Sequence, residues 1–188
     1  MRLVYLIRHA SPAVQPQTPA DEWRLSERGI DEARELGAIA AGWGLRAVYS
    51  STEPKAMNTA ALIGDATGLT AHAVEGFEEL RLSGGWIGNA DAFSDTVRAV
   101  LETPELSLRG SETAAAAAAR FAAGMAIVET GAFPAAVVSH GRAIVAYLAQ
   151  HAGADEPFAL WRSIATPGWI ALDLDGMKLL GSFEGLPA

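Results

Sequence analysis

An arginine and a histidine follow the first apolar segment of the chain. Residues 3–7 form an unbroken apolar run typical of a buried strand, and Arg8 and His9 come directly after it. A guanidinium group can bind an anion through a bidentate fork, and a neutral imidazole can attack phosphorus. These residue types at a strand end therefore indicate binding of, and nucleophilic attack on, an anionic group such as a phosphate ester.

Four further residues could take part in the same chemistry. Lys55 begins the helix expected after the second strand, Glu78 and Glu79 follow the third strand, and His140 follows the fourth. The carboxyl ends of parallel strands meet at one edge of an open α/β sheet, where such proteins bind ligands. Lys55 would add a point charge and His140 a hydrogen-bond donor for phosphate, while a nearby carboxylic acid could protonate the leaving oxygen.

Each candidate also has a simpler interpretation. A single histidine at a strand end is more often structural than catalytic, and Lys55 or the glutamate pair taken alone would be solvated surface charge. Two histidines at the ends of different buried strands instead favour the catalytic interpretation over the structural one. We interpret the remaining histidines, His72 in a short strand and His151 at a helix end, as structural. No histidine or carboxylate spacing resembles a metal-ligand set, so no metal site is predicted.

The segments that would position these residues alternate between strands and helices. Strands are expected at residues 2–7, 46–50, 71–74 and 135–139, followed by a hairpin of 169–173 and 177–181 around Asp175-Gly176. Helices are expected at 26–41, 53–67, 92–102, 112–129 and 141–151, the first capped by Ser26 and the fourth by Ser111. This order predicts an α/β fold, a three-layer α/β/α sandwich whose mostly parallel central sheet has an antiparallel edge strand.

Composition limits the location and the partners of the protein. The 188 residues suit one domain over 1–188, and the absence of cysteine excludes disulfides and thiolate chemistry. A net charge of −8 disfavours nucleic-acid binding. No apolar run is long enough to span a bilayer and the first residues lack the order of a signal peptide, so we expect a cytoplasmic protein with no membrane partner. Only Lys55 and Lys178 are lysines among fourteen basic residues, which makes Lys55 an unusual choice in this chain.

Several segments resemble motifs of the histidine phosphatase (phosphoglycerate mutase-like) superfamily, in order over about residues 1–150. Leu-Ile-Arg8-His9-Ala is similar to the family's Arg-His-Gly signature, and Val-Ser-His140-Gly to its second histidine motif. Ser51-Thr-Glu-Pro-Lys55-Ala-Met-Asn-Thr-Ala is similar to its Ser-x-x-x-Arg-Ala-x-x-Thr-Ala segment. Weaker likenesses cover residues 25–33, 77–79 with 85–88, and 110–112 with Arg120.

The resemblance implies a role for each matching residue. His9 becomes the nucleophile that forms a phosphohistidine, and Arg8, Lys55 and His140 become the phosphate pocket, with Arg8 and His140 also acting in catalysis. Glu79 becomes the general acid and then the base that activates water, with Glu78 as the alternative. The family's reaction needs no metal and no cofactor. The resemblance therefore implies a metal-independent phosphomonoester hydrolase that acts on a small phosphorylated substrate.

The chain departs from the family pattern at three positions. Ala10 replaces the signature glycine, so the chain must turn there without the freedom of glycine. Gln15 stands where many members have asparagine, and we expect it to contact phosphate. Lys55 replaces the second arginine and would bind phosphate as a point charge. Specificity is expected from the loops at 10–24 and 80–110. Candidates for substrate contact are Arg81, Trp86 and Arg142, and surface ion pairing is an equal alternative for the two arginines.

Alternative functions stay open at this stage. A phosphoglycerate mutase-type enzyme would need further cations for a carboxylate, which the weakly basic loops do not favour. A phosphoprotein or phosphohistidine phosphatase would need an open pocket. A non-catalytic phosphate-binding protein is the alternative that is not an enzyme. Residues 152–168, which include Phe158 and Trp161, either cover the core or contribute to a homodimer interface; we prefer the first interpretation.

Overall fold

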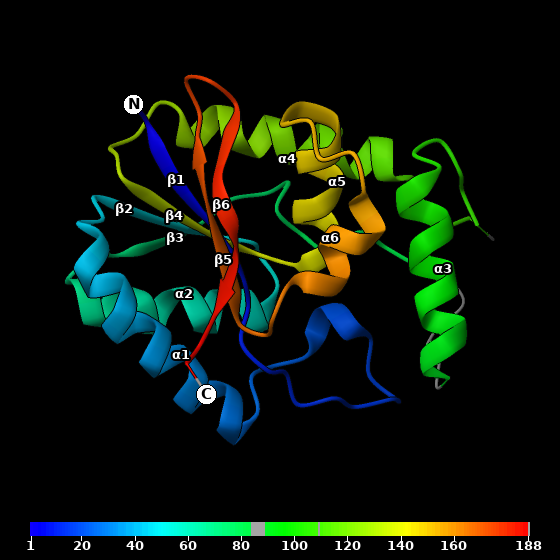
Figure 1. The fold of residues 1–188 in the computed structure, drawn as a ribbon. Helices are drawn as coiled ribbons and strands as arrows, with labels where there is room; N and C mark the ends of the chain where they lie inside the picture. Colours follow the sequence, from blue (N-terminus) through cyan, green and yellow to red (C-terminus); the bar gives the residue numbers. More distant parts are fainter. Residues whose placement is uncertain (84–88, 109, 188) are drawn as a thin grey trace.

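A six-stranded sheet forms the centre of the computed structural model, which describes residues 1–83, 89–108 and 110–187. Its strands lie in the order β3-β2-β4-β1-β5-β6 (Figure 1). The neighbours β3, β2, β4 and β1 pair in parallel, whereas β5 pairs antiparallel with both β1 and β6. The bounds are β1 Leu3–Arg8, β2 Ala47–Ser50, β3 Ala71–Ala73, β4 Ala135–Ser139, β5 Gly168–Asp173 and β6 Lys178–Gly185. The predicted mostly parallel sheet with an antiparallel edge is confirmed.

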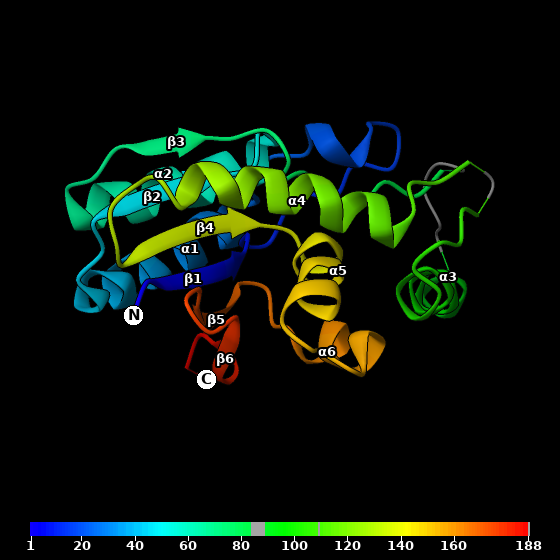
Figure 2. The same ribbon diagram turned by 90° about the horizontal axis from the view of Figure 1, so that it is seen from above.

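Helices cover both faces of this sheet, which confirms the predicted three layers (Figures 1 and 2). On one face, α1 (Glu27–Ala40) and α2 (Pro54–Thr67) pack against apolar side chains of β1, β2 and β4. On the other, α4 (Ala114–Val128) and α5 (Gly141–His151) pack against the alternate side chains of the same strands. The helices α3 (Ala90–Glu102) and α6 (Pro157–Ser163) enclose a third apolar cluster with α4 and α5.

Local sequence signals place most helix ends correctly. Ser26 caps α1 by accepting a hydrogen bond from the Gly29 N–H, as predicted. The predicted cap of α4 is wrong, because Thr113 and not Ser111 accepts from the helix, at the Ala116 N–H. The Ser111 hydroxyl instead accepts a hydrogen bond from the Ser83 N–H, 28 residues earlier. Ser111, which the local sequence predicted as the helix cap, is thus engaged in a long-range hydrogen bond instead.

The register of β1 and β4 fixes the place where the two histidine motifs meet. Arg8 is level with Ser139 in this parallel pair, and the His9 N–H donates to the Ser139 carbonyl at 3.0 Å. All five residues of β4 are buried, so the strand has apolar support on both faces. His9 and His140 therefore leave adjacent strands at the same edge of the sheet.

Residues 152–168 cover part of the core. Phe158 and Ile164 are buried in the third apolar cluster, and Leu160 and Trp161 pack against it. The preferred interpretation of this segment is confirmed, and a homodimer stays a prediction. The segment 80–110, from which specificity is expected, contains α3 and also residues 84–88, which lie outside the described residues. Among the described helices, none combines the length and apolar character needed to cross a bilayer.

Candidate functional site

Two buried histidine rings form the centre of the site. His9 and His140 follow β1 and β4, and their ring centroids are 5.0 Å apart with an interplanar angle of 63°. Only 6% of His9 and none of His140 is exposed to solvent. The sheet register, together with helices on both faces, holds the two rings edge to face in a fixed geometry.

The backbone fixes the protonation of His9. Its Nδ1 lies 2.7 Å from the Ala10 carbonyl oxygen, which can only accept, so we assign the proton to Nδ1. Burial lowers the pKa of His9 to about 3, and the charges of Lys55, Arg8 and Arg142 act in the same direction. At neutral pH the ring is therefore uncharged, and its Nε2 carries an unprotonated lone pair suited to nucleophilic attack.

The turn after His9 is held by α1 and α2. The Ala10 N–H donates to Thr59 Oγ1 at 3.1 Å, and the Ser11 carbonyl accepts from both the N–H and the hydroxyl of Ser26. Gly29 lies so close that an added Cβ would be 2.0 Å from the Ser11 oxygen, so only glycine permits this approach. Ala10 is buried and does not adopt a positive φ, which explains why alanine can replace the signature glycine.

His140 presents one ring nitrogen that has no hydrogen-bond partner within the described part of the chain. Its Nε2 lies 2.9 Å from Ser51 Oγ, whose oxygen also accepts from the Glu53 N–H. We assign the Ser51 hydroxyl as donor to Nε2, which places the ring proton on Nδ1. Burial lowers the pKa of His140 well below its usual value, and His9 and Lys55 lower it further. The neutral ring thus holds an N–H donor for an anion.

Arg8 also has unused hydrogen-bonding capacity. One guanidinium nitrogen donates to the Ile164 carbonyl at 3.0 Å. Its buried Nε, like Nδ1 of His140, has no hydrogen-bond partner among the described residues. Buried donors without partners are costly, so two of them beside one nucleophile favour an anionic ligand that would accept from both. Burial lowers the pKa of Arg8 and the Glu79 charge raises it.

Lys55 is buried beside this pocket, and its partner is a residue that sequence reasoning missed. The ammonium group forms a short ion pair with the Glu53 carboxylate and donates to the Ala20 carbonyl at 2.7 Å. Only 5% of Lys55 and 6% of Glu53 is exposed, which excludes the interpretation of Lys55 as a solvated helix residue. The acidic residue was visible two positions before Lys55, but in sequence it is indistinguishable from an exposed charge at a helix start.

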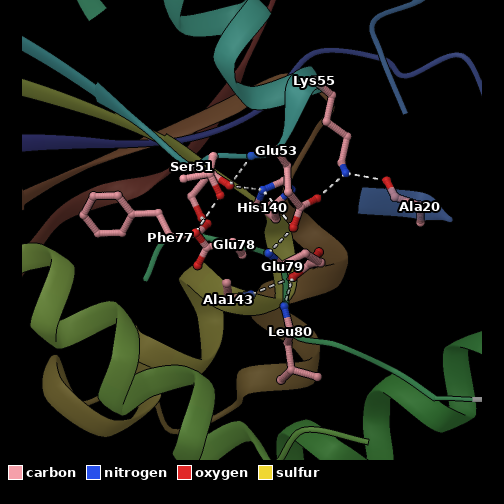
Figure 3. Close-up of polar contacts among 12 residues, drawn as sticks. Ala20, Ser51, Glu53, Lys55, Phe77, Glu78, Glu79, Leu80, His140 and Ala143 are labelled. Atoms are coloured by element: carbon pink, nitrogen blue, oxygen red, sulfur yellow. Dashed lines mark hydrogen bonds and ion pairs between the residues drawn. The ribbon is translucent and has the colours of Figure 1, made fainter. Parts of the chain in front are cut away.

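The structure separates the two adjacent glutamates (Figure 3). Glu79 Oε1 accepts from the Leu80 N–H and from the Ala143 N–H in the first turn of α5, at 2.8 and 3.0 Å. The charge of Glu79 reaches Arg8, whose pKa it raises. Glu78 instead accepts from Thr52 and from the Gly76 N–H. Glu79 is therefore the carboxylate tied to the start of the helix that follows His140.

Arg120 holds the segment that carries these glutamates. From α4 it donates to the carbonyl oxygens of Gly76, Glu78 and Glu79 at 2.7, 2.7 and 3.0 Å. A bidentate pair with Glu112 at 2.7 and 2.9 Å fixes its guanidinium plane. Arg120 was noted in sequence only as part of a motif, because its role depends on residues more than forty positions away.

The remaining candidates lie in different surroundings. Gln15 is exposed, and the contacts recorded for it, with Thr18 and Trp23, stay within its own loop. Arg142 lies in the site, 3.6 Å from Glu79 and hydrogen-bonded to the Leu80 carbonyl. Arg81 is exposed, and Trp86 falls outside the described residues. Within the ranges that the structure describes, no cluster of three histidine or carboxylate side chains is placed to hold a metal ion.

A groove lies beside Glu53 and Glu78. Acidic side chains predominate in its lining, with Asp21, Glu75 and Glu78 beside Arg81 and Arg120. Both cations in this lining lie beside Glu112, because the Arg120 guanidinium is paired with its carboxylate and the Arg81 backbone N–H donates to the same carboxylate at 3.1 Å. The groove therefore offers little to a second anionic group on a ligand.

Comparisons with known proteins agree with this arrangement. A family model described as histidine phosphatase superfamily (branch 1) matches residues 4–179. A solved structure named mycobacterial hydrolase 1 is 25% identical over 92% of this chain and 89% of its own, with a TM-score of 0.73. Mycobacterial glucosyl-3-phosphoglycerate phosphatase is 24% identical over 90% and 89%, with a TM-score of 0.71. YhfR of Bacillus stearothermophilus is 20% identical over 99% and 98%, with a TM-score of 0.74. The comparison with curated proteins found no match.

Proposed function

Because the chain belongs to the histidine phosphatase superfamily, branch 1, we propose that it is a metal-independent phosphomonoester hydrolase acting through a phosphohistidine intermediate. One observation carries this proposal: the buried, neutral His9 exposes an unprotonated Nε2 beside two buried nitrogens that have no recorded partner. The proposed catalytic unit is one domain over residues 1–188, and its substrate is a small phosphorylated compound.

In the first proposed step, His9 Nε2 attacks phosphorus and the bond to the ester oxygen breaks. Arg8, Lys55 and the Nδ1–H of His140 bind the phosphoryl oxygens and stabilise their charge. Glu79, in its protonated form, transfers a proton to the leaving oxygen, so the alcohol departs neutral and His9 carries the phosphoryl group. Because each group is fixed in place, catalysis rests on positioning and charge stabilisation.

In the second proposed step, water replaces the histidine on phosphorus. The Glu79 carboxylate removes a proton from the attacking water, the phosphorus–nitrogen bond breaks, and orthophosphate leaves with His9 neutral again. The same carboxyl group thus returns to its protonated form for the next cycle. The two reaction steps together need no electron transfer and conserve protons.

The acidic groove favours hydrolysis over a phosphoglycerate mutase reaction. A mutase must retain a substrate carboxylate, and the groove that Glu53 and Glu78 line also presents Asp21 and Glu75. These charges would repel such a group, so a substrate whose remaining part is neutral or cationic fits better. Incubation with a phosphoglycerate tests the mutase reaction, because only a mutase would yield the isomer; formation of the isomer would contradict the hydrolase proposal.

The decisive experiment measures hydrolysis of an aryl phosphate by the wild type and by His9→Ala, each with excess chelator. We expect wild-type turnover to survive the chelator and His9→Ala to lose it. The matched control is His72→Ala, because His72 is an exposed histidine on β3 remote from the pocket. A trapped acid-labile phosphoryl enzyme should form in the wild type and in the control only. Chelator-sensitive turnover, or full activity of His9→Ala, would overturn the proposal.

A further inference from the structure

The Glu53 carboxylate connects three parts of the site that come from different segments (Figure 3). Its Oε2 forms the ion pair with Lys55 Nζ, and its Oε1 accepts the Glu79 backbone N–H at 2.7 Å. The same Oε1 lies 3.7 Å from His140 Nε2. A single buried side chain thus contacts the lysine of the proposed phosphate pocket and the backbone of the proposed acid, and lies close to the second histidine.

Helix formation does not explain this side chain. Glu53 occupies the N-cap position of α2, where an acidic residue would ordinarily accept a hydrogen bond from the first helical turn. Its side chain makes no such bond and turns towards Lys55 and Glu79 instead. A buried carboxylate is tolerated only when it is paired and hydrogen-bonded, and both of its oxygens are used in this way.

We propose that Glu53 is a positioning residue of the active site, which orients Lys55 towards phosphate and ties the Glu79 segment to the phosphate pocket. An ammonium group has three N–H donors. Glu53 and the Ala20 carbonyl take two of them, which leaves one defined direction for a phosphoryl oxygen. The proposal rests on the proposed hydrolase function and assigns Glu53 no contact with the substrate.

This arrangement has opposite consequences for phosphate binding and for turnover. The negative charge of Glu53 partly neutralises Lys55 and repels a phosphate dianion, so its removal should strengthen binding of free phosphate. The same removal frees the ammonium group to move, so the reacting groups lose their alignment and turnover falls. A side chain that served only for folding would weaken binding and turnover together.

The test uses Glu53→Gln, which keeps the shape of the side chain. The amide oxygen can still accept the Glu79 N–H, while its NH₂ group would face the Lys55 ammonium and could not bind it. We expect kcat for an aryl phosphate to fall about 10- to 100-fold. We expect the dissociation constant of orthophosphate, measured by calorimetry, to fall about threefold or more. A kcat within twofold of wild type, or orthophosphate binding that is unchanged or weaker, would overturn the proposal.

A double-mutant cycle with Lys55→Met tests whether Glu53 acts through Lys55. Lys55→Met alone should lower kcat about 10²–10³-fold, as expected when one preorganised charge is lost. Adding Glu53→Gln should then change kcat by less than about twofold, because the partner is already absent. Losses that multiply instead would contradict action through Lys55. Asp175→Asn serves as the matched control, since this exposed carboxylate pairs with Arg2 far from the site.

The experiment distinguishes failure of this inference from failure of the proposed function. A wild type without His9-dependent hydrolysis would refute the hydrolase function, and the orthophosphate titrations would still decide the role of Glu53. In that case, tighter phosphate binding in Glu53→Gln that disappears in the Lys55→Met background supports the positioning role. Unchanged or weaker binding overturns it.

Discussion

The two sides of the site are built in different ways. On the histidine side, Arg8 ends β1, His9 follows it and His140 follows the adjacent β4, so the β1–β4 register sets their relative positions. On the acid side, Glu79 lies in an irregular segment after β3, which β4 contacts through a hydrogen bond of 2.7 Å from Ser139 Oγ to the Phe77 carbonyl. Arg120 and Glu53 hold that segment through hydrogen bonds to its carbonyl oxygens and to one N–H.

This difference separates two sources of rigidity. The histidine side takes its rigidity from apolar packing and sheet hydrogen bonds that involve many residues at once. On the acid side, Phe77 and Leu80 are buried in the core, but the glutamates between them are held by a few charged side chains, so a single substitution can displace the Glu79 carboxylate without unfolding the sheet. We therefore expect the acid side to control turnover of substrates with poor leaving groups. We expect the histidine side to control phosphate binding and the attack on phosphorus.

The largest effect that tests this comparison should come from Glu79→Gln. An alkyl phosphate has a poor leaving group that needs protonation, so its turnover should fall about 10²–10⁴-fold. An activated aryl phosphate needs little protonation in the first step and should lose much less. Because Glu79 also serves as the base of the second step, the release of the alcohol in a single turnover, which reports the first step alone, provides the measurement on both substrates, with Glu78→Gln as the matched control. Equal losses on the two substrates, or a larger loss in the control, would argue against Glu79 as the acid.

A smaller effect is expected from Arg120→Lys. Lysine keeps the charge beside Glu112 but lacks the planar fork that serves three carbonyl oxygens, so the acid segment should shift. We expect kcat for an alkyl phosphate to fall about 10- to 100-fold, while inhibition by orthophosphate changes less than twofold. Parallel weakening of phosphate inhibition would show that the two sides of the site are not separable.

The burial of neutral histidines on the histidine side should make the free energy of unfolding depend on pH. The pKa of His9 is about 3 in the folded protein, below its ordinary value near 6.5. Between these values only the unfolded chain binds the proton, so the free energy of unfolding falls as pH decreases from about 6.5, by up to about 1.4 kcal/mol per unit. His140 acts in the same direction. Thermal unfolding of His9→Asn at pH 7.5 and 5.5 should show less acid destabilisation than wild type; an equal shift would contradict the buried neutral His9.

The smallest effect concerns the helix that carries Arg120. Thr113→Ala removes the cap of α4 and should lower the free energy of unfolding by about 1 kcal/mol. Ser111→Ala, the matched control, should cost less, because the exposed Ser83 can bond to water instead. Denaturant titration measures both. If Ser111→Ala proved the more destabilising, the start of α4 would depend on the loop contact and not on its cap.

Local sequence patterns predicted the parts of the molecule that depend on near neighbours. The apolar runs at residues 3–7 and 135–138 indicated buried strands, because consecutive apolar side chains need cover on both faces. The two histidine motifs at the ends of those strands indicated the family, which the match over residues 4–179 confirms. Their proximity followed from the parallel alternation of strands and helices.

The sequence by itself thus determined the layered fold, the family and the histidine pair. Only the tertiary structure decided that Thr113 caps α4 and that Glu79, not Glu78, is bound to the start of α5. It also decided that Glu53 is a buried partner of Lys55 and Glu79. The physical reason is the sequence separation of the interacting residues. Strand and helix patterns arise from residues a few positions apart, whereas the role of a charged side chain depends on distant residues that the fold places beside it.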